Sequence, residues 1–114
     1  MTQASLEATT RLGADGPVIE LRGEIDGGAK DALTNAYAEA PHEGRLLLDF
    51  TAVDYINSTG IALIVGLLAR ARAEHRPVAA SGLTDHYRQI FEITRISDFM
   101  TILDPETTNQ EVAR

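Results

Sequence analysis

The stretch from residue 46 to residue 69 constrains the fold of this chain more than any other. A largely apolar run, Leu46 to Phe50, leads into a short acidic segment and then into Asn57-Ser58-Thr59-Gly60, after which apolar residues dominate as far as Ala69. Such a run is typical of a strand in a parallel sheet that is covered on both faces. The stretch therefore predicts a buried strand, an acidic loop and a helix over about residues 58–75.

Strand and helix patterns alternate along the rest of the chain. The expected strands span about 4–12, 17–22, 46–50, 76–82 and 99–103, and the expected helices about 28–40, 58–75 and 85–94, with a short one after Asp104-Pro105. This order predicts an α/β fold for a single domain, with a mixed, largely parallel central sheet, an N-terminal hairpin and three to four helices. Its core spans about residues 4–104, and residues 105–114 form a short C-terminal helix or tail.

The helix over 58–75 has an unusual distribution of apolar residues. At 100° per residue its core face holds Ile61, Ile64, Val65 and Leu68. Leu63 and Leu67 fall in another sector, together with charged residues, where an amphipathic helix would be polar. Two interpretations remain open: a neighbouring element buries these leucines, or they form an apolar patch for a partner.

Ser58 is expected at the start of this helix, and we expect the function to reside there. A helix N-terminus carries free backbone N–H groups and a partial positive charge, so it accommodates an anion such as a phosphate. Thr59 is expected to be a structural residue of the first turn, and Gly60 to permit a close approach of backbone. Asp26 follows a strand at the same edge of the predicted sheet, where it either caps the first helix or lies near Ser58.

Composition excludes several classes of function. The formal net charge of −7 disfavours direct binding to nucleic acid or to anionic lipid. The chain has no cysteine and three isolated histidines, so no metal site, cofactor or catalytic triad is expected. Nucleotide-binding glycine motifs, a signal peptide and a membrane-spanning apolar stretch are not recognisable either. We expect a cytoplasmic protein that does not insert into membranes and has no intrinsic NTPase activity.

Four short motifs follow one another between about Pro17 and Leu103. They are Gly23-Glu24-Ile25-Asp26, the strand Leu46 to Asp49, Val53-Asp54-Tyr55-Ile56-Asn57-Ser58-Thr59-Gly60, and Arg88-Gln89-Ile90-Phe91-Glu92-Ile93-Thr94. In this order and spacing they resemble the STAS domain of bacterial anti-sigma-factor antagonists. The chain departs from the usual family pattern at Asn57, where an aspartate commonly precedes the serine.

The resemblance implies a partner switch operated on Ser58. In such proteins the serine at this position is phosphorylated by a partner kinase, often an anti-sigma factor with a GHKL-type ATP-binding fold, and a PPM-type phosphatase removes the phosphate. The unphosphorylated form binds the anti-sigma factor and frees a sigma factor. The surface expected to contact the partner comprises Asp26, Asn57, Ser58, Thr59, Gly60, Leu63 and Leu67. The oligomeric state is left open.

Two other functions are compatible with parts of the pattern. A constitutive STAS subunit of a membrane lipid-transport ATPase would share the fold without the switch, with Leu63 and Leu67 contacting an ATPase subunit. A phosphoacceptor receiver domain or a small flavodoxin-like enzyme would share the layered architecture. A receiver domain needs a lysine after a late strand, whereas the sole lysine, Lys30, lies in the first predicted helix.

Overall fold

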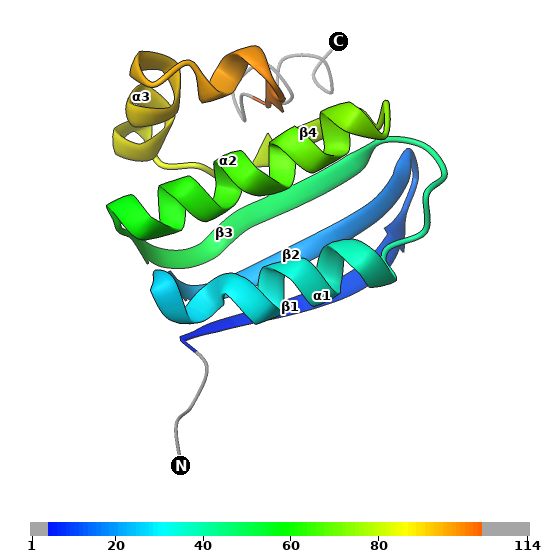
Figure 1. Cartoon of the computed structure of the whole chain (residues 1–114), viewed down its shortest axis with the longest axis horizontal. Coiled ribbons are helices and arrows are strands. Elements are labelled where there is room, and N and C mark those ends of the chain that lie inside the picture. The colour runs from blue at the N-terminus through cyan, green and yellow to red at the C-terminus, as the bar shows by residue number, and fades with distance from the viewer. Residues whose placement is uncertain (1–4, 104–114) are drawn as a thin grey trace, which may run out of the picture.

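Five strands and three α-helices alternate along residues 5–103, the residues that the computed structural model describes (Figure 1). The strands are β1 (Leu6–Gly13), β2 (Gly16–Ile25), β3 (Leu46–Ile56), β4 (Val78–Ser81) and β5 (Thr101–Ile102). The helices are α1 (Lys30–Glu39), α2 (Ser58–Ala73) and α3 (Asp85–Ile93), with 3-10 turns at η1 (Gly27–Ala29) and η2 (Ile96–Asp98). The α/β class and the leading hairpin are confirmed. The helix expected after Asp104 and the tail lie outside the described residues.

The strands form one mixed sheet in the order β1-β2-β3-β4-β5. β1 and β2 are antiparallel, and the remaining neighbours are parallel. Neighbouring parallel strands follow one another in the chain, and crossovers of this kind are right-handed, so the helices between them return on the same face of the sheet. Figure 1 shows α1 and α2 side by side on that face, in front of β2 and β3.

The second face of the sheet is polar where β2 and β3 run past Glu20 and Asp49. Glu20 and Arg22 on β2 and Thr51 on β3 are exposed there, and they line a shallow depression. Among residues 5–103 no helix covers this face, although Val18 and Ala79, which lie on it, are buried. The described residues therefore supply helical cover on one face only. The sequential strand order is the reason, because it sends the crossovers to one side. The apolar run of β3 reflects its central position between β2 and β4.

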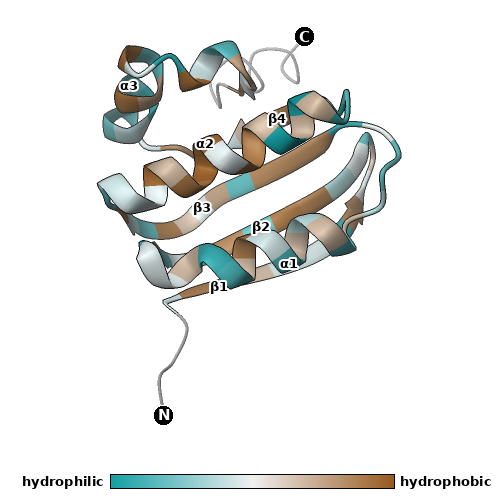
Figure 2. Cartoon of the chain, viewed as in Figure 1, coloured by the Kyte–Doolittle hydropathy of each residue, from teal (hydrophilic) through white to brown (hydrophobic). Residues whose placement is uncertain are grey.

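The hydrophobic core lies between the helices and the covered face of the sheet. Figure 2 shows hydrophobic residues along β2 and β3 where α1 and α2 cover them. Leu33 of α1 and Ile64 of α2 are buried in this layer. Phe91 anchors α3 by an edge-to-face contact with Phe50 of β3, with ring centres 6.0 Å apart. Burying such side chains removes apolar surface from water, which is the main force that holds helix and sheet together.

β3 is longer than the sequence indicated. It continues as strand through Ile56, so the acidic loop expected after Phe50 does not exist. Leu47–Ile56 of β3 runs beside the shorter segment Val18–Ile25 of β2, and the difference is absorbed by register shifts between Glu20 and Arg22 and between Gly23 and Glu24. Bulges of this kind bend a strand and re-aim its end. Here they carry the chain to the start of α2.

Two further expectations about the last third of the chain need correction. The strand expected over 99–103 is confined to Thr101–Ile102, because η2 occupies the segment before it and Phe99 stays outside the sheet, 46% exposed. The strand expected over 76–82 is the shorter β4, and Arg76, two residues before it, has a buried side chain after the preceding turn.

The faces of α2 also differ from the expected pattern. Ile64 and Leu68 face the core as predicted, but Val65 is 46% exposed, so its assignment to the core face is wrong. Leu67 is only 9% exposed. The position of α1 explains both observations, since α1 packs beside α2 and covers the sector of Leu67 while leaving that of Val65 open.

Candidate functional site

Asn57 begins α2 as its N-cap. Its side-chain Oδ1 accepts a hydrogen bond of 2.8 Å from the backbone N–H of Gly60, and its carbonyl accepts from Ile61 N–H at 2.9 Å. Its own N–H donates to the carbonyl of Ile25 at 3.2 Å. An amide side chain is among the best caps because it satisfies a first-turn donor that has no partner within the helix. The start of α2 is thereby attached to the end of β2.

Gly60 permits this attachment. A Cβ atom at this position would lie 1.8 Å from the carbonyl oxygen of Ile25, much closer than any real contact. The neighbour is backbone, so it could not move without displacing β2. The prediction that Gly60 allows a close approach at the helix start is therefore confirmed.

Ser58 and Thr59 are the first two residues of α2, and both are exposed. Within residues 5–103 the Ser58 hydroxyl has no hydrogen-bond partner. The first turn of α2 contains no acidic side chain, so the partial positive charge of the helix start is not neutralised there. This arrangement presents an accessible hydroxyl beside backbone donors, where a phosphate on the hydroxyl oxygen would be stabilised.

Asp26 lies at the same edge of the sheet as this helix start. Ile25 and Ile56 are paired across β2 and β3, so the residues that follow them, Asp26 and Asn57, leave neighbouring strands together. Asp26 caps η1: its Oδ1 accepts 2.6 Å and 2.9 Å hydrogen bonds from the Ser5 hydroxyl and the Gly28 N–H. These bonds, the one from Ser5 foremost, lower the pKa of the Asp26 carboxyl. Asp26 is thus a cap and also a neighbour of the α2 start.

A groove separates α1 from α2. It has a volume of about 200 Å³ and is lined by Lys30, Leu33, Thr34, Tyr37, Ala62, Leu63, Gly66, Leu67 and Arg70. Leu63 is partly buried and packs against the core, whereas Leu67 is buried. Of the two leucines considered for a partner patch, Leu63 therefore keeps some contact area and Leu67 supports the groove from below.

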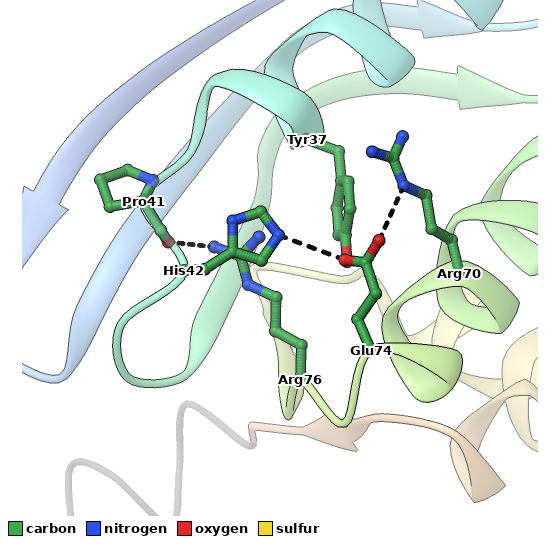
Figure 3. Close-up of polar contacts among 6 residues, drawn as sticks. All are labelled: Tyr37, Pro41, His42, Arg70, Glu74 and Arg76. Carbon is green, nitrogen blue, oxygen red and sulfur yellow. Dashed lines mark hydrogen bonds and ion pairs between the residues drawn. The ribbon is translucent and has the colours of Figure 1, made fainter.

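The other end of α2 carries a polar cluster that the sequence did not indicate (Figure 3). The Tyr37 hydroxyl, on a side chain that is 1% exposed, donates to Glu74 Oε1 at 2.6 Å. His42 Nε2 lies 3.1 Å from the same oxygen, and Arg70 Nε donates to Oε2 at 3.3 Å. These contacts, with the Tyr37 hydroxyl as the largest cause, lower the pKa of Glu74 to about 2.

Arg76 completes the cluster from the turn after α2. It is 7% exposed, its Nη2 donates to the carbonyl of Pro41, and its guanidinium carbon lies 5.1 Å from the centre of the Tyr37 ring. The guanidinium of Arg70 lies 4.6 Å from the same ring centre. Two cations against one buried ring tie α1 to the end of α2. Tyr37 and Glu74 are 37 positions apart, so no local sequence signal could have found the cluster.

Metal coordination and membrane crossing find no support in the described part of the chain. Residues 5–103 contain no group of three or more His, Asp or Glu side chains arranged to hold a metal ion. No helix within the same residues is long and apolar enough to span a bilayer.

Comparison with known proteins identifies the family. A protein-family model described as "Mlab, STAS domain" matches residues 8–104, which is most of the chain. The chain belongs to the STAS domain family. Because the matched region contains β2 to β5, most of β1 and the three helices, the start of α2 and the candidate site lie inside the STAS domain.

A curated relative resembles this STAS domain over part of its length. An anti-sigma-B factor antagonist of Listeria monocytogenes is 36% identical over 61 residues, a region that covers 54% of this chain and 54% of that protein. The match thus spans about half the length of the curated relative.

Solved structures share the fold over a greater length. An anti-sigma factor antagonist from Mycobacterium paratuberculosis matches with a TM-score of 0.70 at 16% identity, covering 99% of this chain and 98% of that one. The Bacillus cell fate determinant SpoIIAA in its phosphorylated form matches with a TM-score of 0.60 at 17% identity, covering 92% and 98%. These similarities establish the architecture as that of a STAS domain.

Proposed function

We propose that this STAS domain is an anti-sigma-factor antagonist that acts by partner switching. The unphosphorylated form binds an anti-sigma factor with serine kinase activity, and phosphorylation of Ser58 releases it. The observation that carries the proposal is the Ser58 hydroxyl, exposed and without a partner within residues 5–103, at the N-terminal end of α2. Similarity to the anti-sigma-B factor antagonist of Listeria monocytogenes supports the same function.

Phosphorylation would change the charge of this surface without requiring a new fold. It adds about −1.5 to −2 charges at neutral pH, next to the positive end of the α2 dipole. The modified helix start can remain as it is, because the Asn57 cap and the Gly60 contact do not involve the Ser58 side chain. An interface that fits a neutral hydroxyl would then enclose a poorly paired dianion. A loss of about 3 kcal/mol would weaken binding roughly a hundredfold.

The partner surface is built around the α2 start. Asp26, Asn57, Thr59 and Gly60 shape the rim near Ser58, and Leu63 offers apolar contact in the groove beside α1, with Leu67 beneath it. Asn57 caps the helix as an aspartate would but carries no charge, so the kinase meets one negative charge fewer beside the acceptor. In this scheme the protein is a substrate and ligand in the cytoplasm rather than an enzyme, and a PPM-type phosphatase regenerates the binding form.

The proposal is tested by phosphorylation followed by mass spectrometry. The wild-type protein, Ser58→Ala and Thr59→Ala are each incubated with ATP and a purified anti-sigma factor with serine kinase activity from the same organism. We expect one phosphate on the wild type and on Thr59→Ala, and none on Ser58→Ala. Equal labelling of wild type and Ser58→Ala would refute the assignment. Binding of the same kinase, measured by calorimetry, should be lost in the phosphorylated protein and in Ser58→Asp.

A constitutive subunit of a membrane lipid-transport ATPase is the second candidate. The observation in its favour is the name of the matching family model, "Mlab, STAS domain", together with the neutral residue Asn57 beside the acceptor. In that function Leu63 and the α1–α2 groove would contact an ATPase subunit, and Ser58 would remain unmodified. Pulldown from the native organism distinguishes the two, since the captured partner would be a transport ATPase rather than a kinase.

A further inference from the structure

The outer edge of β1 is a long strand edge without a partner inside the domain. Within residues 5–103, β1 is the first strand of the sheet order and pairs only with β2. Its eight residues contain no proline, and its register with β2 has no bulge. Proteins usually protect such an edge by shortening it, by adding proline or a bulge, or by covering it, since free N–H and C=O groups recruit another strand. β1 shows none of these devices.

The hydrogen-bond phase of β1 determines which of its residues face outward. Glu24 N–H donates to the Ser5 carbonyl at 2.9 Å, in line with the register that pairs Leu6 with Gly23. In an antiparallel ladder, hydrogen-bonded and non-hydrogen-bonded pairs alternate. The odd-numbered residues of β1 therefore exchange bonds with β2. The N–H and C=O groups that point to the free edge belong to Leu6, Ala8, Thr10 and Leu12.

We propose that this edge pairs with β1 of a second copy of the chain, antiparallel and centred on Thr9. In that register Ala8 exchanges backbone hydrogen bonds with Thr10 of the second copy. Glu7 faces Arg11 of the second copy, and the two-fold axis repeats this pair on the other side. Both charged side chains point to the polar face of the sheet, where they are exposed.

Charge selects this register over its neighbours. Outward-facing residues must pair with outward-facing residues, so the two β1 strands can slide past each other only by two residues at a time. Each such slide moves the centre of the pairing by one residue. Centring on Ala8 or Thr10 places neither charge opposite the other. Centring on Glu7 or Arg11 places like charges face to face, which is unfavourable. Among these registers the one centred on Thr9 is alone in making two opposite-charge pairs.

Neighbouring strands reinforce this charge pattern. Arg22 of β2 lies directly opposite Glu7, and Arg11 already forms an ion pair with Glu20 of β2, with Nε and Oε2 2.7 Å apart. In the proposed dimer the signs therefore alternate from Arg22 to Glu7, then to Arg11 and Glu20 of the second copy. Glu7 and Arg11 each then have an opposite charge on both sides, so the signs alternate across the four strands.

One exposed apolar side chain also finds a place in the dimer. Leu12 is 75% exposed although it belongs to the same face of β1 as Leu6, which is buried. The register places Leu12 opposite Leu6 of the second copy, at the margin of that copy's core. Pairing would therefore remove apolar surface from water in addition to satisfying backbone groups.

The dimer is independent of the proposed switch. A two-fold axis through Thr9 and perpendicular to the sheet keeps the helices of both copies on one face. It also places the two Ser58 residues at opposite strand ends of the continuous sheet, each beyond β3 and separated from the β1 interface by β2. The dimer would present two copies of the α2 start.

Sedimentation of charge variants tests the register. Glu7→Arg and Arg11→Glu should each be monomeric where the wild type dimerises, with a dimer dissociation constant at least about tenfold weaker. An equimolar mixture of the two variants should restore the dimer, because each chain then faces only opposite charges. A wild type that stays monomeric at its highest soluble concentration would overturn the proposal, as would single variants that dimerise like the wild type.

A single cysteine tests the centre of the pairing, since the natural chain has none. Directly opposite residues in a non-hydrogen-bonded pair have Cα atoms about 4.5 Å apart, within reach of a disulfide. Thr9→Cys should therefore cross-link to its symmetry mate under mild oxidation. The matched control Leu12→Cys, exposed on the same strand, should not, because the register holds its copies roughly 20 Å apart. Equal cross-linking of the two variants would refute the register.

Discussion

The two ends of α2 are built in opposite ways. At the C-terminal end Glu74 is bonded by Tyr37, His42 and Arg70, so three side chains from separate segments converge on one carboxylate. At the N-terminal end the Ser58 hydroxyl projects from the helix without a partner among residues 5–103. One end thus joins parts of the fold together through side chains, whereas the other is attached to β2 by backbone and leaves Ser58 and Thr59 exposed.

The electrostatics of the helix follows the same division. Arg70 and Arg72 lie in the last turn, where cations stabilise the negative end of the helix dipole. The first turn contains no acidic residue to stabilise the positive end. A helix optimised for stability alone would carry an aspartate or glutamate there. The comparison teaches that side-chain contacts are concentrated at one end of α2 and accessible side chains at the other.

Breaking the backbone contact at the N-terminal end of α2 should have the largest effect on the free energy of unfolding. Gly60→Ala would force a Cβ atom against the Ile25 carbonyl, at 1.8 Å before relaxation. We expect a loss of about 3 kcal/mol or more in the free energy of unfolding, measured by urea denaturation, because the clash is with backbone in the sheet.

Gly66→Ala is the matched control in the same helix. A Cβ atom at Gly66 meets nothing within 4 Å, and alanine favours the helix interior. This variant should be more stable than the wild type by about 0.5–1 kcal/mol. If the two glycine variants changed stability equally, the close contact between α2 and β2 would not be what holds the helix start.

Removing the Tyr37 hydroxyl should have the next largest effect. Loss of a buried hydrogen-bond donor costs about 1–1.5 kcal/mol, so Tyr37→Phe should lower the free energy of unfolding by that amount at pH 7. The control Tyr55→Phe, at a half-exposed position, should change it by less than about 0.5 kcal/mol.

The pH dependence of Tyr37→Phe checks the same contact. The pKa of Glu74 is lowered from 4.5 to about 2 in the folded protein, so its contribution to stability is complete above pH 4.5 and is lost as the pH falls toward 2. Tyr37→Phe removes the main cause of that shift. The difference between wild type and variant should therefore shrink on acidification over this window, and a difference that stays constant from pH 6 to pH 2.5 would contradict the assigned contact.

What the sequence predicted correctly in this domain is local or periodic. The start of α2, the close approach at Gly60 and the order of strands and helices follow from caps, glycine and hydrophobic spacing within short windows. The continuation of β3 through Ile56 was missed because bulged strand residues near Asp54 have the composition of a loop. Bulges depend on the neighbouring strand, which periodicity within one strand does not report.

The residues of the candidate site show the same distinction between local features and features that depend on neighbouring elements. Asn57 to Gly60 could be placed from the chain alone, since their geometry depends on the first turn of one helix. The burial of Leu67 and the exposure of Val65 could not, because they depend on where α1 packs. The Tyr37–Glu74 contact joins residues 37 positions apart and needed the complete fold.

Changing Asn57, the N-cap of α2, should have a moderate effect on the free energy of unfolding. Asn57→Ala removes the acceptor of the Gly60 N–H and should cost about 1 kcal/mol in the free energy of unfolding. Asn57→Asp restores the acceptor with a charge near the positive helix end, so it should be as stable as the wild type or more so by about 0.5 kcal/mol. Denaturation of the three proteins in parallel separates geometry from charge. Equal destabilisation by alanine and aspartate would mean that the side chain does not cap the helix.

Ser58→Ala should have the smallest effect on stability, although it should abolish phosphorylation. The hydroxyl has no partner within residues 5–103, the side chain is exposed, and alanine is an excellent helix former, so the free energy of unfolding should change by less than about 0.5 kcal/mol. Urea denaturation of this variant beside Asn57→Ala makes the measurement, with the cap variant as the sensitive neighbour. A loss of 1 kcal/mol or more at Ser58 would show that its hydroxyl serves the fold, and the contrast between the two ends of α2 would then fail. An unchanged stability would mean that the fold does not use the hydroxyl, which leaves it to a molecule outside the domain.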